Sequence, residues 1–266
     1  MKLLTIVATT LIATHSPAFA VQAPDPGGAG GPPQGWGLGI GLVASSAIYA
    51  GQDGKLIPVP LVSYESERWY WRGIGGGVRL FELYGLSLDA TLSARLGGIE
   101  KKDFGAIELA QRGINRALLE DRDNGLDLGL AATWSADFGE LELAIKGDAT
   151  GNSKGYEASI KYGYPIQLGR TRITPHAGVT MMSKKLANYY YGTLDTEVAR
   201  GVVNYKPGSA TVPTVGIDAV HPLSDRWVVL GFLSYKALPK AITNSPLLKK
   251  DSKGRASLFL GVSRSF

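Results

Sequence analysis

The stretch Leu86–Leu96 reads LSLDATLSARL, and apolar residues alternate with polar residues along it. Successive side chains of a β-strand point to opposite faces, so this stretch predicts a strand with one apolar and one polar face. The same alternation recurs in residues 126–135, 140–146, 156–164 and 256–263. Repeated strands of this kind predict an all-β chain whose antiparallel sheet has a single apolar side.

The length of these segments favours a membrane barrel over a soluble sandwich. They run for about ten to thirteen residues, whereas strands of soluble proteins average about five or six. About twelve residues at a tilt near 40° rise roughly 30 Å, the thickness of a bilayer's hydrocarbon core. Aromatic residues stand at the strand ends, as at the interfaces of a membrane protein: Trp36, Tyr64, Trp69, Trp71, Tyr84, Trp134, Tyr156, Tyr164, Trp227 and Tyr235. We predict a closed antiparallel transmembrane β-barrel; a soluble core capped by these aromatic residues is the alternative.

The number of strands is left open by one segment. Eleven strand candidates begin near residues 36, 56, 68, 84, 125, 139, 155, 170, 211, 225 and 254, but single-chain bacterial barrels have even numbers. Glycines break the segment Arg68–Phe81, and its run Gly75–Gly77 is expected to mark a bulge or a strong bend. We expect twelve strands, with ten as the alternative, short periplasmic turns and longer outer loops. Residues 106–119 and 246–250 are expected to be partly helical.

The first residues predict export. Lys2 precedes the short apolar stretch Leu3–Ala13, and Ala18-Phe19-Ala20 has the small residues of a cleavage site. That stretch is roughly half of the ~20 residues that a membrane-spanning helix needs. We expect a signal peptide at residues 1–20 cleaved after Ala20, a flexible Pro/Gly-rich segment at 21–35, and a barrel at 36–266 in the cell outer membrane.

The composition argues against several kinds of chemistry. No Cys is present, so disulfides, thiolate metal sites and a cysteine nucleophile are excluded, and a net charge of +5 without a basic run does not predict nucleic-acid binding. His176 and His221 are far apart in sequence and do not predict a metal site. Gly75–Gly77 lacks the Lys-Ser/Thr of a phosphate loop, and no nucleophile-elbow motif accompanies a serine. We therefore expect no catalytic, cofactor-binding or metal-binding residues and no enzyme activity.

Two features concern the barrel interior and wall. Charges of both signs fall on the inward-facing positions, and we expect them to pair across the lumen and leave no wide pore: Arg79, Asp89, Arg95, Asp127, Glu140, Glu142, Lys146, Asp148, Glu157, Lys161, Arg172 and Asp218.

Pro58 and Pro60 are two residues apart, so both fail to donate a hydrogen bond toward the same neighbouring strand. They predict either a weak seam in the wall or a position above the membrane, where water satisfies the opposing carbonyls.

Several motifs, read in order, resemble the MipA/OmpV family. They are Gly37–Val43, Leu56–Val62, Arg68–Trp71, Gly125–Leu130, Asn188–Gly192 with Tyr205–Gly208, and Leu223–Trp227. A last strand that ends on Phe266 also resembles the recognition signal of bacterial outer-membrane barrels. The resemblance implies an outer-membrane protein that contacts lipid and acts as a scaffold for a murein lytic transglycosylase and a bifunctional penicillin-binding synthase.

The resemblance implies no partner-binding residue, so other functions stay open. A small-solute channel or an adhesin would be consistent with a barrel alone. A membrane-embedded lipid hydrolase or acyltransferase is the least favoured alternative. It would need His176, on the polar face of its strand, to lie beside a serine and a carboxylate such as Asp148 or Glu157.

Overall fold

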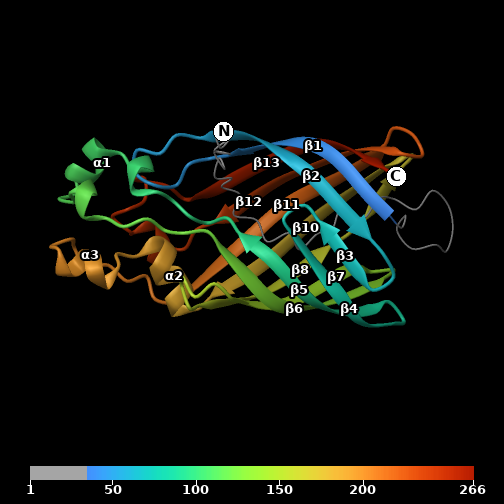
Figure 1. The fold of residues 1–266 in the computed structure, drawn as a ribbon, viewed down its shortest axis with the longest axis horizontal. Helices are drawn as coiled ribbons and strands as arrows, with labels where there is room; N and C mark the ends of the chain where they lie inside the picture. Colours follow the sequence, from blue (N-terminus) through green and yellow to red (C-terminus); the bar gives the residue numbers. More distant parts are fainter. Residues whose placement is uncertain (1–34) are drawn as a thin grey trace, which may run out of the picture.

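The computed structural model describes residues 35–266, which form an antiparallel β-barrel (Figure 1). The signal peptide expected at residues 1–20 and nearly all of the flexible segment lie outside these residues. The wall begins at Gly35, one residue before the expected start. The strands are β1 Gly35–Ser45, β2 Lys55–Glu65, β3 Trp69–Arg72, β4 Gly75–Leu83, β5 Leu86–Arg95, β6 Gly125–Ala136, β7 Gly139–Asp148, β8 Tyr156–Gly163, β9 Ile166–Leu168, β10 Thr171–Met182, β11 Ala210–Pro222, β12 Trp227–Ala237 and β13 Gly254–Ser265.

The barrel is closed and has twelve strand positions. Strands that follow one another along the chain pair with each other, except β8 and β9, and β13 returns to pair with β1. β8 and β9 occupy one position, because both pair with β10 and only Tyr164 and Pro165 separate them. Proline has no N–H to donate, so a break in the strand at Pro165 is expected. The prediction of twelve strands is confirmed.

The strand missing from the sequence-based count lies within residues 68–81. That segment is two strands, β3 and β4, which pair with each other around a tight turn at Gly73–Ile74. Gly73 has φ +63°, a conformation that glycine adopts without strain. The run Gly75–Gly77 lies inside β4, and the register shift occurs later, between Arg79 and Phe81, so the prediction of a bulge at the glycines was wrong. Their small size instead lets the ring of Tyr70 lie against Gly77.

The wall has an apolar outer side, as the alternation predicts. On β6 the outward residues Leu126, Leu128 and Leu130 are about half exposed, whereas the intervening Asp127 is buried at 1%. Large apolar side chains are rarely exposed in such rows on a soluble protein, so this surface matches the lipid-facing band of a membrane barrel. Trp36 and Tyr64 pack together at the periplasmic end of β1 and β2, with ring centroids 4.9 Å apart. No helix within residues 35–266 is long and apolar enough to cross a membrane.

The two ends of the barrel differ. Short turns and the carboxyl terminus lie at one end, and the long connections carry the helices at the other (Figure 1). The rule that long loops face outward makes the helical end extracellular. Its elements are η1 Lys101–Asp103, α1 Ala106–Ala110, η2 Arg116–Leu118, α2 Lys184–Tyr191, α3 Asp195–Ala199 and α4 Lys240–Thr243. The partly helical character expected for 106–119 is confirmed. That for 246–250 was wrong, because α4 ends before Pro246 and no helix begins there.

Substitutions of Gly73 can test whether the β3–β4 turn depends on the left-handed backbone conformation of this residue. A Cβ there would meet nothing within 4 Å, so Gly73→Ala costs only the strain of a left-handed residue, about 1–2 kcal/mol of unfolding free energy. Asn tolerates this conformation better, and Gly73→Asn should recover much of the loss. Urea unfolding of the protein in lipid vesicles measures both values. Equal losses for Ala and Asn would contradict the backbone explanation.

Candidate functional site

Four outer loops pack into one structure, which we call the outer cap: residues 46–54, 96–124, 183–209 and 238–253. They bring together the largest cluster of buried apolar side chains in the described chain, which also includes Ala210 and Val212 of β11: Ile48, Tyr49, Ala50, Ile99, Phe104, Leu109, Ile114, Leu119, Ala187, Val202, Ile242, Leu247 and Leu248. A fully buried Leu contributes about 1.5–3 kcal/mol. Loops with such a core have a fixed structure, so the outer mouth is covered by a folded layer.

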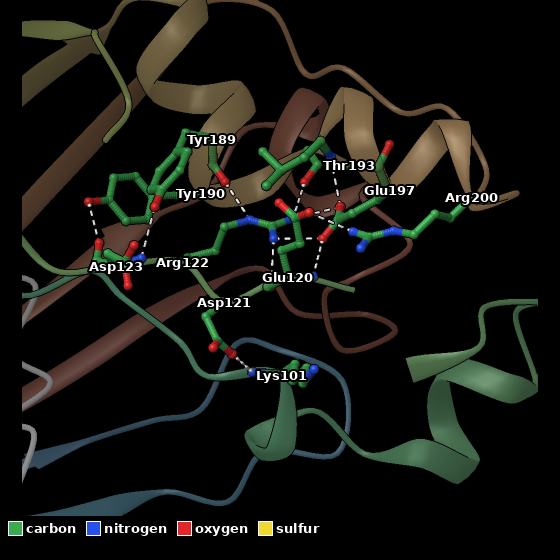
Figure 2. Close-up of polar contacts among 12 residues, drawn as sticks. Lys101, Glu120, Asp121, Arg122, Asp123, Tyr189, Tyr190, Thr193, Glu197 and Arg200 are labelled. Carbon is green, nitrogen blue, oxygen red and sulfur yellow. Dashed lines mark hydrogen bonds and ion pairs between the residues drawn. The ribbon is translucent and has the colours of Figure 1, made fainter. Parts of the chain in front are cut away.

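A buried ion pair stands at the centre of the cap (Figure 2). Arg122 and Glu197 are 2% and 0% exposed, and the guanidinium donates to both carboxylate oxygens at 2.7 and 2.9 Å. Its other N–H groups donate to the carbonyls of Tyr189, Glu120 and Gly192, at 2.7, 2.8 and 3.0 Å. All five donors of the guanidinium are therefore used, which is the condition for a buried charge to be tolerated.

The carboxylate of Glu197 is equally well satisfied. It accepts from the backbone N–H of Glu120 and of Leu194, each at 2.7 Å, besides the two bonds from Arg122. Glu197 and Leu194 lie in the 183–209 loop, and Arg122 and Glu120 lie in the 96–124 loop. One ion pair with its backbone partners thus fixes these two loops to each other.

Further hydrogen bonds join the remaining loops of the cap. The hydroxyl of Tyr49 donates to the carbonyl of Tyr190 at 3.0 Å, and that of Tyr205 donates to the carbonyl of Ala241 at 2.8 Å. Arg112 donates to the carbonyl of Pro246 at 3.0 Å. Burial raises the pKa of Tyr49 well above its usual value, so its phenol stays a neutral donor. These bonds connect the 46–54 and 238–253 loops to the other two, so all four loops of the cap are linked to one another.

A second ionic cluster lines the lumen beneath the cap. Arg95 of β5 forms ion pairs with Asp127 of β6 at 2.7 Å and with Glu157 of β8 at 2.8 Å. Lys146 of β7 lies 3.4 Å from both carboxylates. Two positive and two negative groups balance within this lumen network, and the side chains of Asp127 and Glu157 are almost fully buried.

The predicted inward-facing charges form ion pairs with one another. Arg95 of β5 reaches Asp127 on the adjacent strand β6 and also, past β6 and β7, Glu157 of β8, so the lumen network extends over a part of the lumen as well as along the wall. Near the periplasmic end, Arg79 pairs with Glu65. Asp148 accepts backbone N–H groups of the 149–155 turn and so holds a loop. Pairing of the inward charges is confirmed for these groups. The absence of a wide pore stays a prediction, and the outer cap covers the outer mouth.

The opposite side of the lumen is apolar. Val43 of β1, Val59 of β2 and Phe259 of β13 form a buried cluster, and the rings of Phe259 and Phe232 of β12 stack 5.3 Å apart. We call this group, with the half-buried Ile57, Leu61 and Leu230 that pack on it, the lumen apolar patch. In the order of twelve strands, the patch strands β12–β2 stand opposite β5–β8. The interior therefore has the lumen network on one side and the lumen apolar patch on the other, with Lys236 of β12 and Arg255 of β13 at the outer end of the patch side.

A small cavity lies between the cap and the lumen network. Its volume is about 60 Å³, and its walls include Tyr49, Tyr191, Arg95, Lys236 and Arg255. That space holds a few water molecules at most. It is too small for a substrate-sized molecule, since ligand pockets usually measure ~300–1,000 Å³.

The two histidines do not meet. His176 Nε2 lies 3.6 Å from Asp218 Oδ2 on β11, and His221 Nδ1 lies 2.8 Å from the hydroxyl of Thr171. The carboxylates first considered for His176 are engaged elsewhere, Asp148 with its turn and Glu157 with Arg95. Within residues 35–266 no group of three or more His, Cys, Asp or Glu side chains is placed to hold a metal ion.

The central pair of the cap was not found from the sequence. Arg122 and Glu197 are 75 positions apart, and neither belongs to an alternating strand. The nearest signal was the motif Asn188–Gly192 with Tyr205–Gly208, which the structure brings together. Gly208 N donates to Asn188 Oδ1 at 2.9 Å, and a Cβ on Gly192 would come within 2.9 Å of the Tyr205 carbonyl oxygen.

An apolar outward band, a capped outer mouth and short turns at the other end define a transmembrane β-barrel of the outer-membrane type. The family model described as "MltA-interacting protein MipA" matches residues 38–266, so the chain belongs to this family, the MipA/OmpV family. It is 29% identical to "MltA-interacting protein" of Escherichia coli (strain K12) over 222 residues, 83% of this chain and 86% of that protein. It is also 26% identical to "Putative outer membrane protein YiaT" of the same strain, over 80% of this chain and 85% of that protein.

Among solved structures, the chain is similar to an outer membrane channel from Pseudomonas putida F1. The match covers 91% of this chain and all of that one, with 11% sequence identity and a TM-score of 0.42.

Protease cleavage of the cap loops can measure how much the ion pair of Arg122 and Glu197 stabilises the cap. Arg122→Met leaves the Glu197 carboxylate buried without its counter-ion, which costs about 3–5 kcal/mol. Protease cleavage within 183–209 of the membrane-inserted protein should then become at least about a hundredfold faster, because cleavage follows local opening.

The exposed pair of Arg200 and Glu120 is the matched control. Its side chains are 43% and 38% exposed, so Arg200→Met should cost less than about 1 kcal/mol. The double variant Arg122→Met/Glu197→Leu removes both charges and should regain part of the protection. Equal cleavage of the Arg122 and Arg200 variants would show that the ion pair does not hold the loops.

Proposed function

We propose that this chain is a non-enzymatic outer-membrane scaffold that holds peptidoglycan-remodelling enzymes at the periplasmic face. The partners proposed are a murein lytic transglycosylase and a bifunctional penicillin-binding synthase. The proposal includes export through a signal peptide cleaved after Ala20. It is supported by membership of the MipA/OmpV family and by the name of the E. coli relative, "MltA-interacting protein".

The outer cap is the structural observation that favours a scaffold over an open channel. Its apolar core and its buried ion pair cover the outer mouth, and the cavity lined by Tyr49 and Arg95 beneath it is small. A barrel with a covered mouth can still present its periplasmic turns to partners. Tyr84, in the turn between β4 and β5, is 93% exposed and is a suitable reporter of that face.

Photo-crosslinking in intact cells tests the scaffold role. A benzophenone amino acid at Tyr84 should capture a lytic transglycosylase, because the periplasmic turns face the cell wall. The same group at Ile107, which is 73% exposed in the outer cap, is the control and should capture neither enzyme. The scaffold proposal fails if neither Tyr84 nor the exposed periplasmic positions Phe138 and Leu223 capture a cell-wall enzyme.

Conductance across a planar bilayer separates the scaffold from a small-solute channel. We expect the wild-type protein to show little or no conductance, because the cap covers the mouth. Arg122→Met, which loosens the cap, should raise the conductance above that of Arg200→Met. A large and stable wild-type pore would favour the channel.

A further inference from the structure

The barrel wall is incomplete beside β2. Along one edge β2 pairs with β1 over its whole length, from Lys55 to Glu65, but along the other it pairs with β3 only at Ser63, Tyr64 and Glu65. The next strand, β4, pairs with β5 from Gly75 onward. Figure 1 shows the β3–β4 hairpin between β2 and β5, ending well before the outer cap.

The end of the hairpin fixes where pairing stops. Gly73 N donates to the Val62 carbonyl at 3.0 Å, and Ala94 N donates to the Ile74 carbonyl at 2.9 Å. Beyond these two bonds, no described strand lies between residues 56–61 of β2 and the outer end of β5. We call this part of the wall the seam. Its outer limit is the ion pair of Lys55 and Asp103, with Nζ and Oδ2 3.0 Å apart.

Both prolines of β2 face the seam. The carbonyl of Val62 points to the hairpin side, and residues two apart on a strand point their backbone groups to the same side. Pro60 and Pro58 therefore turn their ring nitrogens to the edge that has no strand. Proline is found on such edges because it has no N–H to lose.

The seam lies at the level of the membrane core. Pro58 is opposite Leu42 of β1, which is in turn opposite Leu260 of β13, and these two leucines are about half exposed on the lipid side. Pro60 is opposite Ile40, another exposed side chain. These exposed apolar neighbours argue against the alternative that both prolines lie above the membrane.

At the seam β2 is apolar on both of its faces. Leu56, Pro58 and Pro60 are exposed on the outer side, and the intervening Ile57, Val59 and Leu61 belong to the lumen apolar patch. A hydrocarbon that enters the seam from the membrane thus meets apolar side chains on both faces of the strand. A charged or polar solute from outside meets the cap and the ion pair of Lys55 instead.

We propose that the seam binds the acyl chain of a membrane lipid, which lies beside β2 in contact with both faces of the strand. An acyl chain needs no hydrogen bonds from the open edge. An added peptide strand is disfavoured, because Pro58 and Pro60 lack donors and the Val62 carbonyl is already bonded to Gly73. This site does not depend on the proposed scaffold role.

Contact labelling by a reactive lipid tests the proposal. The protein is inserted into phosphatidylcholine vesicles containing a phosphatidylcholine with a diazirine on its acyl chain, irradiated and mapped by mass spectrometry. Adducts are expected on the inward-facing Ile57 or Leu61 as well as on the outward-facing Leu56. The matched control is Ala131→Ile, which places an isoleucine inward on β6, a strand paired on both sides. The isoleucine introduced at position 131 should carry at least about fivefold fewer adducts than Ile57 or Leu61.

A second variant tests the apolar nature of the site. Val59→Thr is nearly isosteric and adds one hydroxyl at the centre of the lumen apolar patch, so adducts on Ile57 and Leu61 should fall several-fold while those on Leu128 stay unchanged. Unchanged heat-modifiable gel mobility confirms that the barrel still folds. Adducts confined to outward-facing side chains, or equal labelling of Ile57 and the Ala131→Ile site, would overturn the proposal.

Discussion

Backbone hydrogen bonding in a medium without water controls this structure. Each N–H or C=O left unpaired in hydrocarbon costs several kcal/mol, so a sheet that crosses a bilayer has to close on itself. The pairing of β10 with β11 and of β13 with β1 provides that closure. The seam beside β2 departs from the rule, and it is the stretch where the chain places Pro58 and Pro60. These prolines remove two donors that would otherwise face hydrocarbon without a partner.

The closed barrel in lipid also determines which apolar side chains are buried and which face outward. Lipid surrounds the wall, so most large apolar side chains of the strands point outward and cannot form a central core. The main buried apolar cluster lies in the outer cap, built by loops that would be the least ordered part of many soluble proteins. A cap with its own core can keep a fixed shape above the membrane, and the pair of Arg122 and Glu197 fixes its two longest loops to each other.

The strands could be predicted from the sequence and the cap could not, for a physical reason. Alternation reports which face of a strand meets lipid, so β5, β6 and β13 were found close to their observed bounds. The β3–β4 turn was missed, because a two-residue turn at Gly73 within a glycine-rich segment leaves the alternation too short to read. Contacts such as Arg122 with Glu197 depend on how distant loops meet, which no local period encodes. The inward charges were identified, but which of them pair depends on the strand register and on how the barrel closes.

The cap and the seam lie next to different parts of the lumen. The lumen network, on β5–β8, is balanced in sign, and it lies under a cap that covers the direct route from outside. The lumen apolar patch, on β12–β2, adjoins the stretch of wall beside β2 that lacks a paired strand among the described residues. The side chains at the seam are apolar on both faces of β2, so a hydrocarbon chain that leaves the bilayer for them stays in apolar surroundings. Under the proposal made for the seam, the interior of this barrel is covered on its outer side and is reached by hydrocarbon from the membrane.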